Sequence, residues 1–329
     1  METLLLTRSD VVRLLPQSRC IDAVEDVFRL LGEGKAQPPA TLAVHAEGGG
    51  FHIKAGLLAR GDRVYCAVKN NGNFPVNAER GLPTIQGLVM LCDGNDGRVL
   101  AVMDSMELTA LRTAAATAAA ARVLARADST TVAVIGCGVQ SRHQLRALAA
   151  VLPLRRVAAF DLHPERAESF CREMASELGI EAVPRPDVGS ATRGADVIVT
   201  CTTAREFVLG PDDVEPGTFV AGVGADNEVK RELHPALMAR ARVVTDLRDQ
   251  CARIGDLHHA LEAGTLTLAD VHADLGEVVA GLRPGRMDDG EITVFDSTGF
   301  GLLDAAAAAA VYEAAAGDSG PVRSVAFGR

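Results

Sequence analysis

The stretch from Thr131 to Asp161 constrains the fold more than any other part of the chain. It opens with Thr131-Val-Ala-Val-Ile135, an apolar, β-branched run that is long enough for one buried strand. Gly136-Cys-Gly138 follows directly, then a helical pattern, and then a second apolar run over residues 157–160 that ends at Asp161. Strand, glycine turn, helix, strand and acid in this order predict a dinucleotide-binding βαβ unit.

The chemistry of a dinucleotide explains each part of this pattern. Gly136 permits the tight turn, and Gly138 lets backbone N–H groups approach a pyrophosphate at the helix N-terminus. Asp161 can accept hydrogen bonds from a ribose diol, and its charge would repel a 2′-phosphate, so we expect NAD rather than NADP. His163 and Arg166 follow closely and would soften that preference by contacting a phosphate. Two glycines alone would indicate only a turn, but here strand, helix and acid agree with them.

Composition bounds the remaining possibilities. A chain of 329 residues suggests about two domains. The formal charge is −10 and there is no basic stripe with interleaved aromatic residues, so we expect no nucleic-acid partner. The apolar run near the N-terminus is too short for a signal peptide, and Arg and Thr interrupt the Ala-rich stretches, so we expect no membrane span.

The cysteines and histidines give no sign of a disulfide framework or a metal site. The seven cysteines are scattered, odd in number and without CxxC spacing, which indicates buried thiols in a reducing compartment. His234, His258 and His259 have no partner at a convincing metal-ligand spacing, so we expect them to be structural. The sequence therefore predicts a cytoplasmic protein without a metal.

The first third of the chain predicts helices followed by a largely antiparallel sheet. Ser9 is a candidate N-cap for a helix over 10–15, and a second helix is expected over 22–31. The period then changes to two, which predicts five strands at 41–45, 51–55, 64–69, 86–92 and 99–103. A long Ala-rich helix capped at Asp104-Ser105 and running to Arg126 leads into the glycine unit, so a domain boundary is expected near it.

The second part alternates strands and helices. Strands are expected at 181–183, 196–200, 218–223, 243–246 and 291–296, with helices at 165–178, 235–241 and 249–263. Buried strands with intervening helices predict an α/β fold with a Rossmann doubly wound sheet. The last helix, 303–316, lies beyond that sheet, and we expect it to cross back to the N-terminal domain.

Two lysines lie in predicted strands. Lys69 ends the apolar run Val64-Tyr-Cys-Ala-Val68, and Lys54 interrupts the strand before it. A buried lysine is costly unless a partner or ligand holds it, so both cations are candidates for binding a substrate carboxylate. An edge position facing water would explain Lys69 without any function.

Asp226 follows a strand of the second part, in Gly224-Ala-Asp-Asn-Glu-Val-Lys230. Ligands of open α/β sheets lie outside the carboxyl ends of the strands, where a carboxylate is placed for proton transfer. The alternative is that Asp226 is the N-cap of a helix that reaches Leu233.

Together these motifs resemble the ornithine cyclodeaminase/μ-crystallin family over essentially the whole chain. The residues that carry the resemblance occur in order along the sequence: Lys69, Arg80-Gly-Leu-Pro-Thr-Ile-Gln86, Met103-Asp104, Leu111-Arg-Thr-Ala-Ala115, Gly136-Cys-Gly-Val-Gln140, Val223-Gly-Ala-Asp226, Lys230 and Val294-Phe-Asp-Ser-Thr298.

The resemblance implies a mixed, largely antiparallel α+β domain for substrate binding and dimerisation over residues 1–115, completed by the C-terminal helix 303–329. The Rossmann domain would cover residues 116–302. Lys69 and Lys54, with Arg112, would bind the substrate, and Asp226 would act as acid and base at the amine. The implied NAD(H) site comprises Thr84, Arg112, Thr113, Gly136, Gly138, Val139, Gln140, Asp161, Thr202, Val223, Gly224, Lys230 and Ser297.

One position departs from the family pattern. Many members have an Arg just after a proline in the carboxylate clamp, whereas this chain has Pro38-Pro39-Ala40-Thr41. Lys54, His45 or His52 would have to supply the charge. The departure weakens the case for ornithine as substrate and favours a differently shaped or more acidic one.

The resemblance implies a homodimeric NAD(H)-dependent oxidoreductase that transfers hydride at the α-carbon of a small L-amino acid or its imine. One alternative is an ornithine cyclodeaminase, a lyase that forms proline and ammonia and recycles its NAD. Another is a crystallin-like protein that binds nucleotide without turnover; Asp226 argues against it, because a pure binder needs no proton transfer. We expect Lys69 and Asp226 to meet in one cleft.

Overall fold

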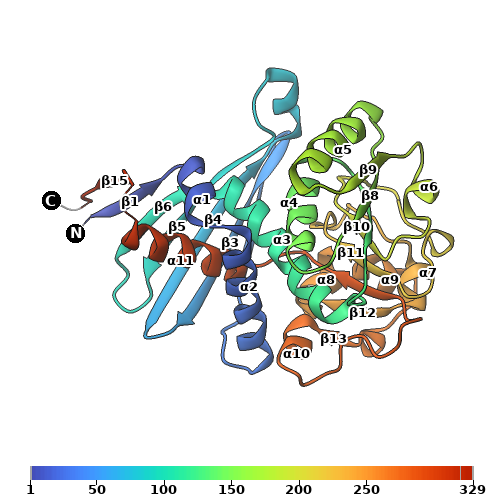
Figure 1. Cartoon of the computed structure of the whole chain (residues 1–329). Coiled ribbons are helices and arrows are strands. Elements are labelled where there is room, and N and C mark those ends of the chain that lie inside the picture. The colour runs from blue at the N-terminus through green and yellow to red at the C-terminus, as the bar shows by residue number, and fades with distance from the viewer. Residues whose placement is uncertain (1, 319, 328–329) are drawn as a thin grey trace. The chain divides into compact units, whose positions relative to one another are not determined.

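The computed structural model describes residues 2–318 and 320–327, and these form two compact units (Figure 1). Unit 1 contains the described residues up to Arg112 and those from Phe300 onward, and unit 2 runs from Thr113 to Gly299. The predicted domain boundaries, after residues 115 and 302, lie three residues from these divisions. The first division falls within helix α3 (Ser105–Leu124), which ends two residues before the predicted Arg126.

Unit 1 is built on a seven-stranded mixed sheet in the order β15-β1-β6-β5-β4-β3-β2. The five predicted strands are present, and β2 to β6 pair as antiparallel neighbours. Two short strands at the opposite edge were not predicted: β1 pairs in parallel with β6, and β15 pairs with β1. The strands are β1 (Thr3–Leu6), β2 (Ala40–Ala46), β3 (Gly49–Arg60), β4 (Arg63–Asn73), β5 (Ile85–Asp93), β6 (Val99–Asp104) and β15 (Arg323–Val325).

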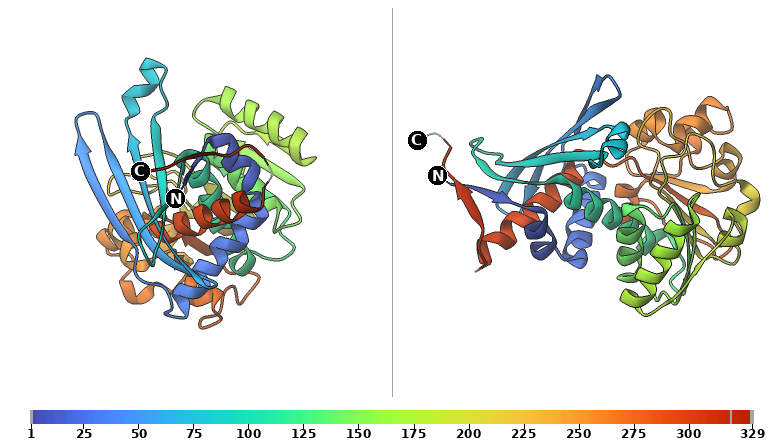
Figure 2. Two further views of the ribbon diagram at one scale, coloured as in Figure 1. Left: turned by 90° about the vertical axis from the view of Figure 1, so that its left-hand side faces the viewer. Right: turned by 90° about the horizontal axis from the view of Figure 1, so that it is seen from above.

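Three helices belong wholly to unit 1: α1 (Arg8–Leu14), α2 (Gln17–Gly32) and α11 (Gly301–Gly317). The predicted cap at Ser9 was wrong. Thr7 caps α1 instead, because Thr7 and Asp10 form a reciprocal capping box. The C-terminal helix α11 packs on α2 and across β3, β4 and β5, and Figure 2 shows these helices on one side of the sheet.

The N-terminus of α11 lies almost in backbone contact with β3. A Cβ atom on Gly301 would come within 2.3 Å of the Ala55 carbonyl oxygen, and one on Gly56 would come within 2.7 Å of the Leu302 nitrogen. Only glycine at both positions permits this approach. It brings the first turn of α11 beside Lys54, the residue that precedes Ala55.

The opposite face of this sheet carries large exposed apolar side chains. They come from strands β2, β3 and β5, with β4 lying between β3 and β5, and they are Leu42, Val44, Phe51, Leu88 and Met90. Alternate residues of β5, such as Val89 and Leu91, are fully buried, so the exposed set lies on the face turned away from the helices. We call this set the open apolar face.

Unit 2 is an eight-stranded parallel sheet in the order β13-β12-β14-β11-β10-β7-β8-β9. The central part has the doubly wound arrangement that the sequence predicted, with the change of direction between β7 and β10. The last strand in sequence, β14, lies between β11 and β12. The strands are β7 (Thr131–Ile135), β8 (Arg156–Phe160), β9 (Glu181–Pro184), β10 (Val197–Thr200), β11 (Phe219–Gly222), β12 (Arg242–Thr245), β13 (Ala273–Asp274) and β14 (Thr293–Asp296).

The predicted helices of unit 2 are present, but the one over 249–263 is divided at Gly255, and two short helices, Val188–Thr192 and Leu275–Val279, were not predicted. The predicted helix 249–263 is two helices, because the Asp296 carboxylate accepts from the Asp256 and Leu257 backbone nitrogens and so caps a new helix there. A Cβ on Gly255 would lie 2.5 Å from that carboxylate. The helices are α4 (Val139–Ala149), α5 (Pro164–Leu178), α6 (Val188–Thr192), α7 (Pro235–Arg240), α8 (Arg248–Ile254), α9 (Asp256–Glu262) and α10 (Leu275–Val279).

Two predictions from composition can be compared with the structure. All seven cysteines lie in the described part of the chain, and each is a free thiol. No helix among the described residues is long and apolar enough to cross a membrane.

Candidate active site

The glycine loop of unit 2 connects β7 to α4 as the sequence predicted. Gly136 has φ +94°, and a Cβ there would lie 2.8 Å from the Thr202 side chain, so this position requires glycine. Gly138 has no heavy atom within 4 Å of an added Cβ. The second glycine is therefore dispensable for packing within the chain, which leaves close approach of a ligand as its physical reason.

The N-terminus of α4 suits an anion. Gly138 is the N-cap, and within residues 2–318 and 320–327 no side chain caps this turn. The first backbone N–H groups of α4, those of Val139 and Gln140 among them, therefore lack the usual partner and point out of the helix. A pyrophosphate would satisfy them, with the helix dipole favouring its charge.

Asp161 connects the glycine loop to the end of β8. Its Oδ2 accepts from the Cys137 nitrogen at 2.8 Å, and its Oδ1 accepts from the His163 nitrogen at 2.9 Å. Each carboxylate oxygen keeps a lone pair for a ribose hydroxyl. Val139 and Leu162, on either side, are 63% and 86% exposed, as expected for apolar groups that cover an adenine ring.

A buried acid that the sequence analysis missed holds the loops after β10 and β11. Glu232 accepts from the Thr202 and Gly224 backbone nitrogens at 2.6 and 2.7 Å, and from the Thr200 hydroxyl at 2.8 Å. A Cβ on Gly224 would come within 2.4 Å of the Thr202 carbonyl oxygen, so the two loops touch. Glu232 thus fixes both loops that carry the predicted cofactor residues Thr202, Val223 and Gly224.

Further carboxylates lie buried at the same ends of the strands. Burial raises the pKa of Glu232 and, together with the charges of Asp296 and Glu232, raises that of Asp256 well above its usual range. Burial and the nearby Asp246 raise the pKa of Asp296 to about 7. Asp246 accepts from the Ser297 hydroxyl at 3.2 Å and so orients the serine predicted to lie near the nicotinamide.

Asp226 lies in the loop that follows β11. Residues 227–233, all described, form no helix, so the N-cap alternative was wrong. The Asp226 Oδ1 instead accepts from Lys230 Nζ at 2.6 Å, and the two side chains are 48% and 16% exposed. An exposed carboxylate on a loop beyond a strand end, paired to a cation, is accessible to a substrate.

Lys69 and Lys54 are not edge residues facing water. Lys69 is 3% exposed and its Nζ donates to Asp304 Oδ1 at 2.9 Å, which is the same oxygen that Arg112 Nε contacts at 2.9 Å. Lys54 is 9% exposed and lies directly opposite Lys69 in the β3–β4 pairing. We call Lys54, Lys69, Arg112 and Asp304 the cationic cluster; all four belong to unit 1.

The cationic cluster contains three cations and one carboxylate, that of Asp304. Burial, then the charges of Arg112 and Lys54, lower the pKa of Lys69 to about 7 despite its contact with Asp304. The pKa of Asp304 is lowered although burial opposes this, because Arg112 and Lys69 favour its charged form. Asp304 Oδ2 is buried with no hydrogen-bond partner among the described residues. A ligand with a carboxylate would add negative charge to the cluster, and a hydrogen-bond donor beside that carboxylate would give Asp304 Oδ2 a partner.

The sequence analysis missed Asp304. The signal was a single acid in an apolar run of this helix, Leu303-Asp-Ala-Ala-Ala-Ala-Ala-Ala-Val311. Asp304 is fully buried, and a buried acid requires a cationic partner. The partner, however, is 235 positions away in sequence, and only the packing of α11 on β3 and β4 identifies it.

Several predicted residues stay predictions. Thr84 is exposed in the segment before β5, and Arg112 forms an ion pair with Asp304. Both residues belong to unit 1, whereas the glycine loop belongs to unit 2. Thr113 is the first residue of unit 2. His45, offered as a substitute for the missing arginine, is exposed on β2, while Lys54 is buried in the cluster, which favours Lys54 for that role.

A cavity of about 810 Å³ in unit 2 lies apart from these residues. Arg242, which begins β12, lies in its lining together with Arg248, His272 and Glu291. None of the predicted site residues lines it. The cavity is therefore assigned no part in the reaction.

A doubly wound sheet with an uncapped glycine loop, and with an acid directly after the second strand, is typical of dinucleotide-dependent oxidoreductases. The chain matches the ornithine cyclodeaminase/mu-crystallin family over residues 1–319, and it belongs to that family. It is 39% identical to an alanine dehydrogenase from Archaeoglobus fulgidus over 95% of both chains. It is 38% identical to an iminosuccinate reductase from Paracoccus denitrificans over 95% of this chain and 96% of that one.

A solved structure agrees with the sequence relatives. The archaeal alanine dehydrogenase dimer with bound NAD superposes with a TM-score of 0.94 at 38% identity, covering 99% of this chain and 100% of that one. The family resemblance and the Rossmann fold class predicted from the sequence are confirmed.

Proposed function

We propose that this protein is an NAD-dependent amino-acid dehydrogenase or imine reductase that acts on a small substrate with a carboxylate next to the reacting carbon. The observation that carries the proposal is the cationic cluster, in which two lysines and an arginine are buried beside the single carboxylate of Asp304. The NAD-bound relative and the reductase relative support the class of reaction.

The residues of unit 1 bind and orient the substrate. Lys54 and Lys69 hold the carboxylate, and Arg112 keeps Asp304 charged and in place. Asp304 in turn keeps Lys69 from losing its proton entirely in a buried setting. A substrate carboxylate adds a second negative charge and so raises the affinity of Lys69 for its proton.

The residues of unit 2 supply the nucleotide site and the proton. The uncapped start of α4 and Asp161 hold the pyrophosphate and the ribose, and NAD(H), when bound, supplies or accepts the hydride at the α-carbon. Asp226 gives a proton to the substrate nitrogen during reduction and removes one during oxidation. Lys230 keeps the Asp226 carboxylate oriented until the substrate arrives.

A cyclodeaminase would use the same groups, because it also removes and returns a hydride at the α-carbon. The missing arginine after Pro39 favours the dehydrogenase or reductase. The decisive experiment supplies candidate α-imino acids with NADH, and ornithine with NAD, and follows both absorbance and ammonia. Proline formed from ornithine with no net change in NADH would replace our proposal with the cyclodeaminase. Nucleotide binding without any turnover would replace it with the crystallin-like binder.

We further propose that the protein forms a homodimer through the open apolar face. Five large apolar side chains on one sheet face are more than a monomer usually exposes together, and the related alanine dehydrogenase is a dimer. Sedimentation of the wild-type protein and of Leu88→Glu tests this, with Leu268→Glu, an exposed leucine of unit 2, as the control. A monomeric wild-type protein would rule the dimer out.

The place of the enzyme in the cell is also a proposal. Seven free thiols, most of them buried, suit a reducing compartment, and we propose the cytoplasm.

A further inference from the structure

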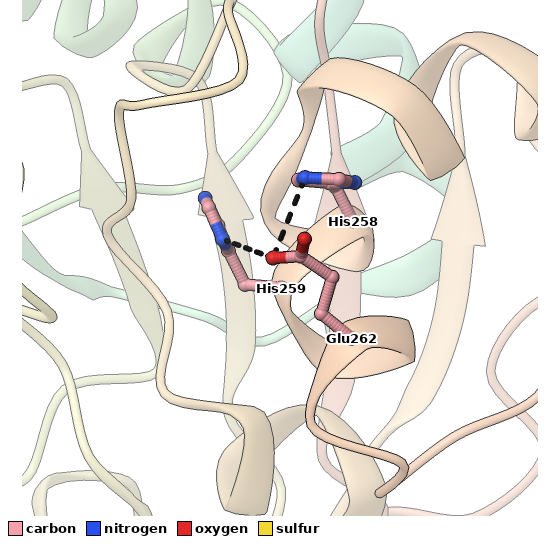
Figure 3. A group of neighbouring side chains, drawn as sticks. All are labelled: His258, His259 and Glu262. Carbon is pink, nitrogen blue, oxygen red and sulfur yellow. Dashed lines mark ion pairs between the residues drawn. The ribbon is translucent and has the colours of Figure 1, made fainter.

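Two histidines and a glutamate on α9 converge on one point at the surface of unit 2. Figure 3 shows the side chains of His258, His259 and Glu262 turned toward one another from a single helix. Their ligand atoms all lie within 4.8 Å of one another. His259 is 6% exposed, His258 23% and Glu262 65%, so the group has a buried floor and an open side.

Backbone carbonyl groups set the orientation of both imidazole rings. His259 Nε2 lies 2.9 Å from the Lys230 carbonyl oxygen, and His258 Nδ1 lies 3.2 Å from the Ala252 carbonyl oxygen. A carbonyl oxygen only accepts hydrogen bonds, so the ring nitrogen that faces it carries the proton. The other nitrogen of each neutral ring, Nε2 of His258 and Nδ1 of His259, therefore presents its lone pair. Both of these nitrogens face Glu262.

Such an arrangement is what metal-binding histidines require. A histidine that binds a metal usually donates its other N–H to a carbonyl or carboxylate, which fixes the tautomer and the ring. Packing adds to this here, because the Phe207 ring lies edge-on to His259 with the centroids 6.0 Å apart. Two lone pairs that converge on a carboxylate oxygen, with both rings held from behind, form a preorganised ligand set.

The distances fit a tetrahedral metal ion. Glu262 Oε2 lies 3.5 Å from His258 Nε2 and 3.7 Å from His259 Nδ1. Zinc at about 2.0–2.1 Å from such ligands places two of them about 3.3 Å apart at tetrahedral angles. These two separations exceed this by only a few tenths of an ångström, and the two imidazole nitrogens lie within 4.8 Å of each other, so side-chain rotation would have to bring the three ligands together.

We propose that His258, His259 and Glu262 form a binding site for a zinc-class divalent cation, with the fourth position open to water. Two imidazoles and one carboxylate suit zinc rather than calcium or magnesium, which prefer all-oxygen sites. From the sequence these histidines were expected to be structural, because they have no partner at a convincing metal-ligand spacing. Glu262, one turn further on, supplies the shared ligand.

The site is connected to the loop that carries Asp226. His259 holds the carbonyl oxygen of Lys230, and Lys230 Nζ holds Asp226. A bound cation restricts the His259 ring, and through these two hydrogen bonds it restricts the loop. The cation is thus placed to stabilise the loop from outside the reaction.

Direct binding to the full-length protein tests the proposal without reference to activity. The protein is stripped with a chelator, and zinc is titrated by calorimetry, with the visible spectrum of the cobalt form as a second measurement. We expect one zinc ion per chain and a cobalt spectrum of the tetrahedral type. Glu262→Gln and His258→Gln, both at partly exposed side chains, should each abolish the tight binding while thermal melting without metal stays unchanged.

A surface pair elsewhere in unit 2 provides the matched control. His163 Nδ1 lies 3.7 Å from Glu165, a pair like that of His259 and Glu262 but without a second imidazole. His163→Gln should bind zinc as the wild-type protein does. Equal zinc binding in wild type and Glu262→Gln, or no stoichiometric binding by wild type, would overturn the proposal and leave a histidine–glutamate ion pair.

Discussion

Lys54 and Lys69 are direct partners across the β3–β4 ladder, and both are buried. Like charges in this position repel each other, and burial adds the cost of desolvation. One carboxylate, Asp304, offsets this for Lys69. The arrangement is costly for the free protein, and under the proposed function a bound substrate carboxylate would offset part of that cost.

Lys69→Ala should raise KM for the carboxylate substrate by about 10- to 100-fold, since a charge-assisted contact contributes about 1.5–3 kcal/mol. The glycine loop and Asp161 belong to unit 2, whereas Lys69 belongs to unit 1, so NADH affinity should not change. NADH fluorescence titration and steady-state kinetics measure the two effects separately. A loss of NADH binding equal to the loss of substrate binding would contradict the assignment of Lys69 to the substrate.

Asp226→Asn should reduce turnover by about 10²- to 10⁴-fold, the usual effect of losing a positioned acid or base, with little change in substrate affinity. Glu228→Gln, an exposed acid two residues along the same loop, is the control and should retain turnover. If Asp226→Asn works at the wild-type rate, another group transfers the proton.

Asp161→Ser should weaken the preference for NADH over NADPH, because it removes a negative charge from the place of the 2′-phosphate. The ratio of kcat/KM for the two cofactors measures this. Serine can still accept the hydrogen bond from Cys137 N that Asp161 accepts at 2.8 Å, so the glycine loop should survive. Equal use of both cofactors by the wild-type enzyme would show that Asp161 does not discriminate.

Substrate binding should take up a proton at pH 8. Burial lowers the pKa of Lys69 to about 7, so at pH 8 the free protein holds this lysine mostly neutral. A bound carboxylate favours the charged form and raises that pKa, so affinity falls as pH increases above about 7. Calorimetry in buffers of different ionisation enthalpy measures the proton uptake, and Lys69→Met should abolish it. Proton release on binding would show the opposite linkage.

The lowered pKa of Lys69 also makes the free energy of unfolding depend on pH. Between about pH 7 and the ordinary lysine value of 10.5, Lys69 is neutral in the folded protein and charged in the unfolded one. The unfolded state then binds more protons, so this residue makes the free energy of unfolding increase with pH over that range. Lys69→Met should reduce the difference between the free energies of unfolding at pH 7 and pH 9, which urea unfolding measures.

Gly301→Ala should destabilise the protein by about 1–3 kcal/mol, because its methyl group would collide with the Ala55 carbonyl and push α11 from β3. The shift displaces Asp304, so KM should rise as well. Gly317→Ala, at the other end of α11 with open space around the added Cβ, should change neither property. Normal KM with lowered stability would mean that Asp304 tolerates the displacement.

The sequence was sufficient where a property depends on neighbouring residues. The strand, turn, helix and acid of the unit from Thr131 to Asp161 follow one another directly in the sequence, and the positions of all four were predicted correctly. Lys69 and Asp226 were recognised because a buried lysine and an acid after a strand are unusual locally. The strands β1 and β15 were not predicted from the sequence, because each is short and pairs with segments distant in sequence.

The partners of buried charges could not be predicted in this way. Glu232 and Asp304 look like ordinary helix or loop acids in the sequence, and their roles depend on groups brought together by the fold. The break in the helix at Gly255 has the same origin, since the Asp296 carboxylate that causes it comes from a strand 41 positions later. Long-range charge compensation is thus the part that required the structure.

The position of Asp304 also determines when the substrate site can exist during synthesis. Lys54 and Lys69 leave the ribosome first, but the carboxylate that Lys69 pairs with lies 235 positions further along the chain. Unit 2, which is continuous in sequence, can fold while the chain is still being extended. The lysine-bearing sheet lacks the Asp304 carboxylate until α11 emerges, so a segment translated after unit 2 completes a sheet translated before it.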